Sequence, residues 1–181
     1  ALEDGKKIVF IRHAIAPGNG DPDEFDINDC SSQRNLNEKG RNQSKKIGDF
    51  FRINKIKIDT VLSSEWCRCK DTAKLAFGNF KTFSALNSFY ETRFAKNKSE
   101  QIKELRNFIK NWEDDSNLII VTHFVVISAP KGAELAFDRL TNLSNGVGLP
   151  LGGGAVWIAQ RFVSPVGLPL RLHQNVFART V

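Results

Sequence analysis

The amino-acid sequence predicts an α/β fold, a three-layer sandwich in which a mainly parallel central sheet has helices on both faces. Buried strands are predicted by three short apolar runs, at 8–11, 59–63 and 118–123. Between and beside them lie segments with the apolar spacing of helices, at 36–54, 64–77 and 97–112. Strands that alternate with helices favour parallel pairing, because each helix returns the chain to the same end of the sheet.

The composition is that of an ordinary globular protein. The 181 residues are 41% hydrophobic and 25% charged, which predicts one domain over residues 1–181 with a core of normal size. No run of about 18 apolar residues occurs, so a membrane-spanning helix is not expected. The net charge of +6 comes largely from lysines on the predicted helices, without a basic cluster interleaved with aromatic residues. Nucleic acid is therefore not an expected partner.

The sequence contains three cysteines, Cys30, Cys67 and Cys69. Three are too few for a disulfide scaffold, but they allow one bridge and one free thiol. The Cys-x-Cys pair has neither a second pair nor a histidine cluster near it, so a zinc site is not expected. The first residue is Ala1 rather than Met, which fits either a mature chain after removal of a signal peptide or a trimmed chain.

The first strand leads directly into Arg12 and His13, two side chains that bind phosphate well. A loop rich in Gly, Pro, Asp and Asn follows at 15–35. Loops of this length in compact domains are usually binding loops or lids, and its start beside His13 favours a lid. Its acidic residues lack the spacing of an EF-hand, so a calcium site is not expected.

The next two helices are predicted by periodicity. Segment 36–54 has apolar residues on one face and lysines and arginines on the other, which is typical of an amphipathic helix. The helix at 64–77 follows the second strand after a short turn, and Ser63 or Ser64 would cap its first N–H groups. A helix start directly after a strand is suited to binding an anion.

Segment 81–98 is irregular and aromatic, which indicates a loop that crosses the edge of the sheet. The helix at 97–112 has the clearest apolar face in the chain, and we expect Asn97 and Glu100 to open it with a variant of the capping box. The strand that follows it ends in His123.

The character of the chain changes near Pro130, after which glycines are frequent and lysines are rare. We interpret the tail as closing strands and long loops of the same domain, with strands expected at 155–160 and 170–177. A helix that starts after His123 would be interrupted at Pro130 and would have to resume within 131–143.

The ends of the predicted strands carry a specific chemistry. Because the carboxyl ends of parallel strands meet at one edge of a sheet, we expect Arg12, His13, Arg68 and His123 to converge on one pocket. Guanidinium groups bind tetrahedral oxyanions with a forked geometry. One imidazole can attack phosphorus while a second stabilises charge on the phosphoryl oxygens. For any one of these residues a structural role is the simpler interpretation, but the four together favour a phosphate site.

Several motifs, in order, resemble the histidine phosphatase superfamily, branch 1, which has the phosphoglycerate mutase-like fold and includes the SixA-like phosphohistidine phosphatases. The motifs cover residues 6–128 and are Arg12-His13-Ala14, Arg34-Asn35-Leu36 with Gly40 and Gln43, Ser63-Ser64 with Arg68 to Ala73, and Thr122-His123. The amino-acid sequences of the loop and of the Trp-Cys-Arg-Cys segment resemble those of a bacterial subgroup related to the Ais lipopolysaccharide-core phosphatases. Cys69 and Asp71 depart from the usual Ala and Gln, and residues 131–181 do not align with the family.

The resemblance implies a role for each matching residue. His13 would be the nucleophile that becomes phosphohistidine, with its other ring nitrogen donating to a backbone carbonyl. The phosphoryl oxygens would be held by Arg12, Arg68 and His123. The acid that protonates the leaving oxygen would be Glu91, with Glu65 as the second candidate. Further substrate contacts are expected from Arg34 and Ser64, no metal or cofactor is implied, and His173 is treated as incidental.

The predicted function is hydrolysis of a phosphomonoester, or of phosphohistidine, through a covalent intermediate on His13, with a small phosphorylated molecule as the substrate. Two alternatives remain open, a non-catalytic phosphate-binding or sugar-phosphate-binding protein on the same fold and a phosphotransferase of the phosphoglycerate mutase type. The resemblance to an exported subgroup, together with the missing initiator Met, predicts a periplasmic or secreted protein with Cys30 bridged to Cys67 or Cys69, the alternative being a cytoplasmic one.

Overall fold

The computed structural model of the protein describes residues 2–129, 137–142 and 156–161. Its strands form one six-stranded sheet in the order β3-β2-β4-β1-β6-β5. The first four strands pair in parallel, and their bounds are β1 Lys7–Arg12, β2 Ile58–Ser63, β3 Lys81–Thr82 and β4 Asn117–Thr122. The last two pair antiparallel beyond β1, and their bounds are β5 Phe137–Asn142 and β6 Val156–Arg161. The predicted mainly parallel sheet is confirmed.

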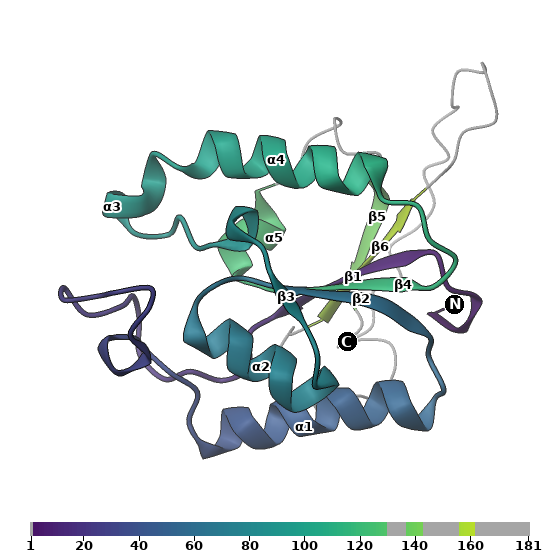
Figure 1. Ribbon diagram of the computed structural model, residues 1–181, viewed down its shortest axis with the longest axis horizontal. Coiled ribbons are helices and arrows are strands. Elements are labelled where there is room, and N and C mark those ends of the chain that lie inside the picture. The colour runs from purple at the N-terminus through teal and green to yellow at the C-terminus, as the bar shows by residue number, and fades with distance from the viewer. Residues whose placement is uncertain (1, 130–136, 143–155, 162–181) are drawn as a thin grey trace, which may run out of the picture.

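The helices cover the sheet on both faces, which makes the three predicted layers. In Figure 1, α1 and α2 lie on one face of the sheet, and α4 and α5 lie on the other. The bounds of the α-helices are α1 Glu38–Ile53, α2 Cys67–Phe77, α3 Thr92–Ala95, α4 Lys98–Asn111 and α5 Phe124–Ser128. Short 3-10 turns are η1 Leu2–Asp4, η2 Cys30–Ser32 and η3 Ser84–Leu86. Within the described part of the chain, no helix combines the length and the apolar character needed to cross a bilayer.

Alternation along β1 divides the core between the two faces. Val9 and Ile11 belong to the cluster that packs on α1 and α2, whereas Ile8 and Phe10 belong to the cluster that packs on α4 and α5. All four side chains are at most 2% exposed. A strand covered on both faces must be apolar at every position, which explains the uninterrupted run in the sequence.

The predicted helix at 97–112 is confirmed, but two predicted helix caps are wrong. The helix after the second strand begins at Cys67 with Trp66 as its N-cap residue, so neither Ser63 nor Ser64 caps it. Asn97 precedes α4 in a helical backbone conformation and makes no side-chain cap, so the expected capping box does not form.

The tail differs from expectation in one place. The expected strand at 155–160 is present as β6, but the chain at 137–142 forms β5 instead of resuming a helix. Antiparallel pairing with β6 gives this segment its backbone hydrogen bonds. The expected strand at 170–177 and His173 lie outside the described residues, and the extent of one domain over 1–181 stays a prediction.

Candidate active site

The sheet brings the two predicted histidines together. β1 and β4 are neighbours in parallel, with Arg12 opposite Thr122, so His13 and His123 both follow at the same edge. The backbone N–H of His13 donates to the carbonyl of Thr122 over 2.9 Å, and the two imidazole centroids are 5.4 Å apart.

His13 is held as a neutral imidazole. Its Nδ1 lies 2.8 Å from the carbonyl oxygen of Ala14, which can only accept, so Nδ1 carries the proton and Nε2 carries the lone pair. The ring is 6% exposed. Burial, followed by the charge of Arg68, lowers the pKa of His13 to about 3, against the opposing effect of the Ala14 hydrogen bond. The geometry expected of a nucleophile is therefore present.

The chain after His13 is fixed by the residues of two of the motifs. The Ala14 N–H donates to Thr72 Oγ1 over 3.0 Å, and the Ile15 N–H donates to Gln43 Oε1 over 3.0 Å. At Gly40 a Cβ atom would lie 2.1 Å from the carbonyl oxygen of Ile15, so only glycine lets α1 approach this closely. These contacts explain why the spacing of the motif residues matters for the position of His13.

His123 is the second buried imidazole, and it is 4% exposed. Its Nε2 lies 3.0 Å from Ser64 Oγ and 3.5 Å from Cys69 Sγ. Burial, followed by the charges of Arg68 and His13, holds the pKa of His123 well below its ordinary value. Ser64 itself is fully buried. The structure places Ser64 against His123, and Ser64 does not line the cavity beside His13 where a substrate contact was expected.

Arg68 forms a buried ion pair that the sequence did not reveal. Its Nη1 and Nη2 lie 2.7 Å and 3.0 Å from Oδ1 and Oδ2 of Asp21, and the two side chains are 3% and 2% exposed. Burial alone would raise the pKa of Asp21, but the hydrogen bonds and charge of Arg68 outweigh it, and the pKa is lowered. Among the described residues, Arg68 Nε is buried without an acceptor.

Arg34 ties the loop at 15–35 around the site. Its Nε donates to the carbonyl of Gly20 over 2.8 Å, and its Nη1 donates to the carbonyl of Ala16. Its backbone N–H donates to Asp21 Oδ1 over 3.0 Å. These hydrogen bonds hold the end of the loop, at Arg34, against the backbone of its first half.

These residues enclose a cavity of about 160 Å³. Six of the predicted site residues line it, namely Arg12, His13, Arg34, Arg68, Glu91 and His123. Glu65, the second candidate for the acid, lies instead on a neighbouring groove of about 850 Å³ and accepts a hydrogen bond from Asn87 Nδ2 over 2.6 Å.

Glu91 reaches the cavity with both carboxylate oxygens engaged. Oε1 accepts from the Asp21 N–H over 2.8 Å, and Oε2 lies 2.7 Å from Nη2 of Arg93. Both oxygens are therefore held by groups of the protein, so these contacts have to open before Glu91 can act on a substrate oxygen.

Two site residues were missed in the sequence, Asp21 and Trp66. The indole N–H of Trp66 donates to Asp21 Oδ2 over 3.1 Å, and the ring centroid lies 5.5 Å from that of His123. The available signal was weak, a Gly-Asp-Pro turn within a loop that has several acidic residues and no periodicity.

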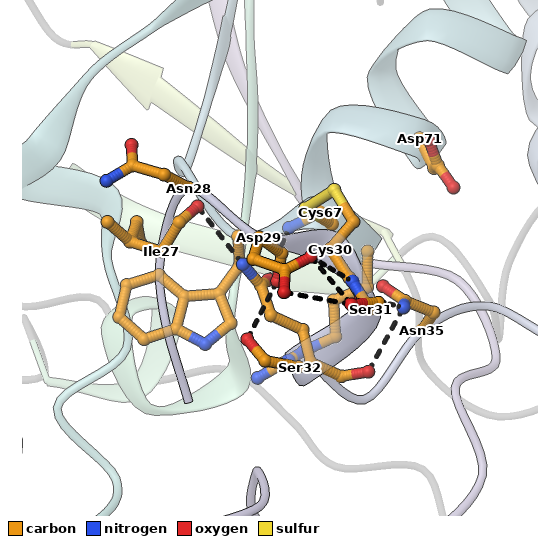
Figure 2. The surroundings of a disulfide bond; sticks show 12 residues. Ile27, Asn28, Asp29, Cys30, Ser31, Ser32, Asn35, Cys67 and Asp71 are labelled. Carbon is orange, nitrogen blue, oxygen red and sulfur yellow. Dashed lines mark hydrogen bonds between the residues drawn. A yellow bond between two sulfur atoms is a disulfide. The ribbon is translucent and has the colours of Figure 1, made fainter. Parts of the chain in front are cut away.

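A disulfide joins Cys30 of the loop to Cys67 at the start of α2, with Cα atoms 5.6 Å apart. Figure 2 shows the bond linking the loop around Asp29 and Ser31 to the helix. Of the two pairings left open, the structure selects Cys67. Cys69 is free and buried, and burial raises the pKa of its thiol to about 12. In the described ranges, no three potential metal ligands gather into a cluster.

Comparison with known proteins gives one family. The model of the histidine phosphatase superfamily, branch 1, matches residues 8–118, which is more than half of the chain. No curated protein sequence matches.

Three solved structures illustrate the likeness in fold. An α-ribazole-5'-P phosphatase, described as putative, from Escherichia coli is 15% identical with a TM-score of 0.50, over 68% of this chain and 76% of that one. A SixA phosphohistidine phosphatase from Agrobacterium tumefaciens, also described as putative, is 20% identical with a TM-score of 0.46, over 66% and 68%. A similar SixA protein from Nakamurella multipartitia is 19% identical with a TM-score of 0.49, over 69% and 63%. The first of these likenesses shows a shared fold.

Proposed function

Because the chain belongs to the histidine phosphatase superfamily, branch 1, we propose that it hydrolyses a phosphomonoester, or phosphohistidine, through a phosphohistidine intermediate on His13. The observation that carries this proposal is the Nδ1 contact of His13 with the Ala14 carbonyl, which leaves Nε2 unprotonated inside a cavity lined by three arginines. A lone pair on a buried, oriented nitrogen beside cationic groups is what attack on a phosphoryl group requires.

In the first step, His13 Nε2 attacks phosphorus in line with the leaving oxygen. The N–P bond forms as the P–O bond to the leaving group breaks, and the leaving oxygen takes a proton. Arg12 and Arg68 place positive charge beside the phosphoryl oxygens, where negative charge is concentrated during transfer. His123 contributes a neutral imidazole at the same edge of the cavity.

In the second step, water attacks phosphorus, the N–P bond breaks and inorganic phosphate leaves. The water gives up one proton, and Nε2 of His13 regains its lone pair. We assign the protonation of the leaving oxygen in the first step and the deprotonation of water in the second to Glu91, which lines the cavity. Its contacts with Arg93 and Asp21 would have to lengthen when it takes up the proton.

The test is hydrolysis of p-nitrophenyl phosphate by purified wild-type protein and by His13→Ala, with His173→Ala as a control that removes the remaining histidine not assigned to the site. We expect His13→Ala to lose ~10³-fold or more of kcat, while His173→Ala keeps wild-type kcat. Rapid quench into an alkaline denaturant with a ³²P-labelled substrate should trap an alkali-stable, acid-labile phosphoprotein in the wild type only.

Each alternative function predicts a different result. If the protein only binds phosphate, neither the wild type nor His13→Ala should hydrolyse p-nitrophenyl phosphate, although both should bind phosphate. If it is a mutase, adding a bisphosphate cofactor should raise the activity of the wild type. Unchanged hydrolysis by His13→Ala would rule out the proposed intermediate.

We also propose that the protein is exported to an oxidising compartment, periplasmic or extracellular. The Cys30–Cys67 bond supports this proposal, because structural disulfides persist in oxidising environments and are rare in the reducing cytosol of most organisms.

A further inference from the structure

We propose that Asp21 is a positioning residue for the phosphoryl group: its carboxylate fixes Arg68 so that one edge of the guanidinium, formed by Nε and Nη2, is kept for an oxyanion. The proposal rests on the proposed function, because it assigns Arg68 to a phosphoryl oxygen. It adds a residue outside the matching motifs, on the loop between the first motif, at 12–14, and the second, which begins at Arg34.

An inventory of the guanidinium shows which edge remains. Arg68 has five N–H bonds in one plane. One hydrogen on Nη1 and one on Nη2 go to Asp21, and Nη1 also lies 3.3 Å from the carbonyl of Arg34. The Nε hydrogen and the second hydrogen of Nη2 share the remaining edge, and Nε finds no acceptor among the described residues. A buried donor without an acceptor costs free energy, so an oxyanion that takes it is favoured.

Asp21 is already saturated as an acceptor. Its Oδ1 receives Arg68 Nη1 and the Arg34 N–H, and its Oδ2 receives Arg68 Nη2 and the indole N–H of Trp66. Four donors fill the four acceptor positions of a carboxylate. Asp21 therefore acts on a substrate through Arg68 and not by direct contact.

The carboxylate lies behind Arg68 and does not occupy the phosphate position. Arg68, Arg34 and Gly20 line the cavity of about 160 Å³, whereas Asp21 is not among the described residues that line it. Its side chain is 2% exposed. An acidic side chain that blocked the pocket as a phosphate substitute would lie on the cavity wall, so the geometry favours support over blockage.

The charge of the site agrees with this role. Arg12, Arg34 and Arg68 bring three positive charges to the cavity, Asp21 compensates one, and Glu91 is compensated by Arg93. The two positive charges that remain match a dianionic phosphomonoester. Without Asp21, Arg68 would be a buried charge without a partner before substrate binds, which is strongly unfavourable.

The first test compares Asp21→Asn with Asp23→Asn, which makes the same change at an exposed position of the same loop. Orthovanadate binding is measured by calorimetry at pH 7, together with kcat and KM for p-nitrophenyl phosphate. We expect Asp21→Asn to raise both the vanadate Kd and KM by about tenfold or more, because an unrestrained guanidinium loses its forked geometry. Asp23→Asn should keep wild-type values.

Measuring KM and kcat separately distinguishes a residue that positions Arg68 from one that only stabilises the fold. A protein that only folds less well has fewer active molecules and a lower apparent kcat, but its folded fraction keeps the wild-type KM and Kd. Vanadate binding also separates this proposal from the proposed function. If the wild type bound vanadate without turning over substrate, the catalytic proposal would fail while the effect of Asp21→Asn on Kd could still be measured.

Asp21→Asn leaves the buried guanidinium of Arg68 without a counter-charge, so this variant could fail to fold. A second comparison covers that case. Arg68→Ala and the double variant Asp21→Asn with Arg68→Ala lack that unpaired cation. Arg68→Ala keeps the negative charge of Asp21 beside the site, so the double variant should bind vanadate as weakly as Arg68→Ala or somewhat more tightly, but not more weakly, if Asp21 acts only through Arg68. The proposal is overturned if the double variant binds vanadate more weakly than Arg68→Ala, or if Asp21→Asn binds vanadate as tightly as the wild type or more tightly.

Discussion

The carbonyl oxygen of Ala14 decides which nitrogen of His13 can react. Because a carbonyl only accepts, the 2.8 Å contact fixes the proton on Nδ1 and leaves Nε2 for phosphorus. The same two residues follow β1 without a break, so the strand that supports the nucleophile also supplies the group that orients it. Thr72, which accepts a hydrogen bond from the Ala14 N–H, helps to hold this carbonyl in place.

Glu91 gives a prediction at the scale of one residue. If Glu91 protonates the leaving oxygen, Glu91→Gln should reduce kcat/KM for an alkyl phosphate by about 100-fold or more, the usual contribution of a general acid. The same variant should have a much smaller effect on p-nitrophenyl phosphate, because p-nitrophenolate leaves without protonation. The measurement is steady-state kinetics, which gives the loss of kcat/KM in Glu91→Gln for each of the two substrates.

Glu65→Gln is the matched control, because Glu65 was the second candidate and lies on the neighbouring groove. Glu65→Gln should change kcat/KM only slightly, and by the same factor for the alkyl phosphate and for p-nitrophenyl phosphate. Equal losses on the two substrates in Glu91→Gln would instead assign Glu91 to holding the Asp21 loop, through the contact of its Oε1 with the Asp21 N–H.

At the scale of elements, the disulfide ties the loop at 15–35 to the start of α2, across 37 positions of sequence. Thiol titration in denaturant should count one free thiol, from Cys69, without reductant and three after reduction. Reduction should lower the free energy of unfolding by about 2–4 kcal/mol, because it releases a constraint on the unfolded chain.

The control for reduction is the double variant Cys30→Ser with Cys67→Ser. Its denaturation curve should be the same with and without reductant. Three free thiols in the untreated wild-type protein would contradict both the bond and the proposed export.

The contact between α1 and α2 provides a second prediction for elements. A Cβ atom at Gly48 would lie 2.1 Å from the backbone carbonyl oxygen of Ala76, so Gly48→Ala forces the two helices apart. We expect a loss of about 1–3 kcal/mol in unfolding free energy, measured by urea denaturation, because overpacked contacts cost this much. Lys46→Ala, at an exposed position of the same helix, should stay within about 0.5 kcal/mol of the wild type.

The sequence predicts features that depend on a local pattern of residues. It does not predict features that depend on contacts between residues far apart in the chain. The runs before His13 and His123 were recognisable because strands buried on both faces must be apolar throughout, and the residue after each run then lies at the sheet edge. Ser64 was assigned to capping and to substrate, since nothing local shows that its hydroxyl lies within hydrogen-bond distance of His123 Nε2. Asp21 could not be identified, because an irregular loop has no periodicity from which a contact with Arg68 can be read.

At the scale of the whole molecule, the site adds positive charge and two imidazoles to an edge that the sheet and loop shield from water. His13 and His123 are 6% and 4% exposed, and burial, followed by the charge of Arg68, lowers the pKa of both. The cost of this arrangement falls on the stability of the entire fold, since a neutral, buried histidine has to gain a proton when the protein unfolds in acid.

Acid should therefore destabilise the protein partly through His13. Its pKa is about 3 in the folded protein and about 6.5 when unfolded, so between these values the unfolded chain binds more protons. The free energy of unfolding must then rise with pH across this window and fall as pH decreases from about 6.5 towards 3.

From pH 7 to pH 5 the contribution of His13 to the free energy of unfolding decreases by about 2 kcal/mol. The stability lost between pH 7 and pH 5, measured by urea denaturation, should be smaller in His13→Gln than in the wild type by this amount. An equal pH dependence in His13→Gln would mean that folding leaves the pKa of His13 near its ordinary value, which would contradict the lowering by burial and by the charge of Arg68.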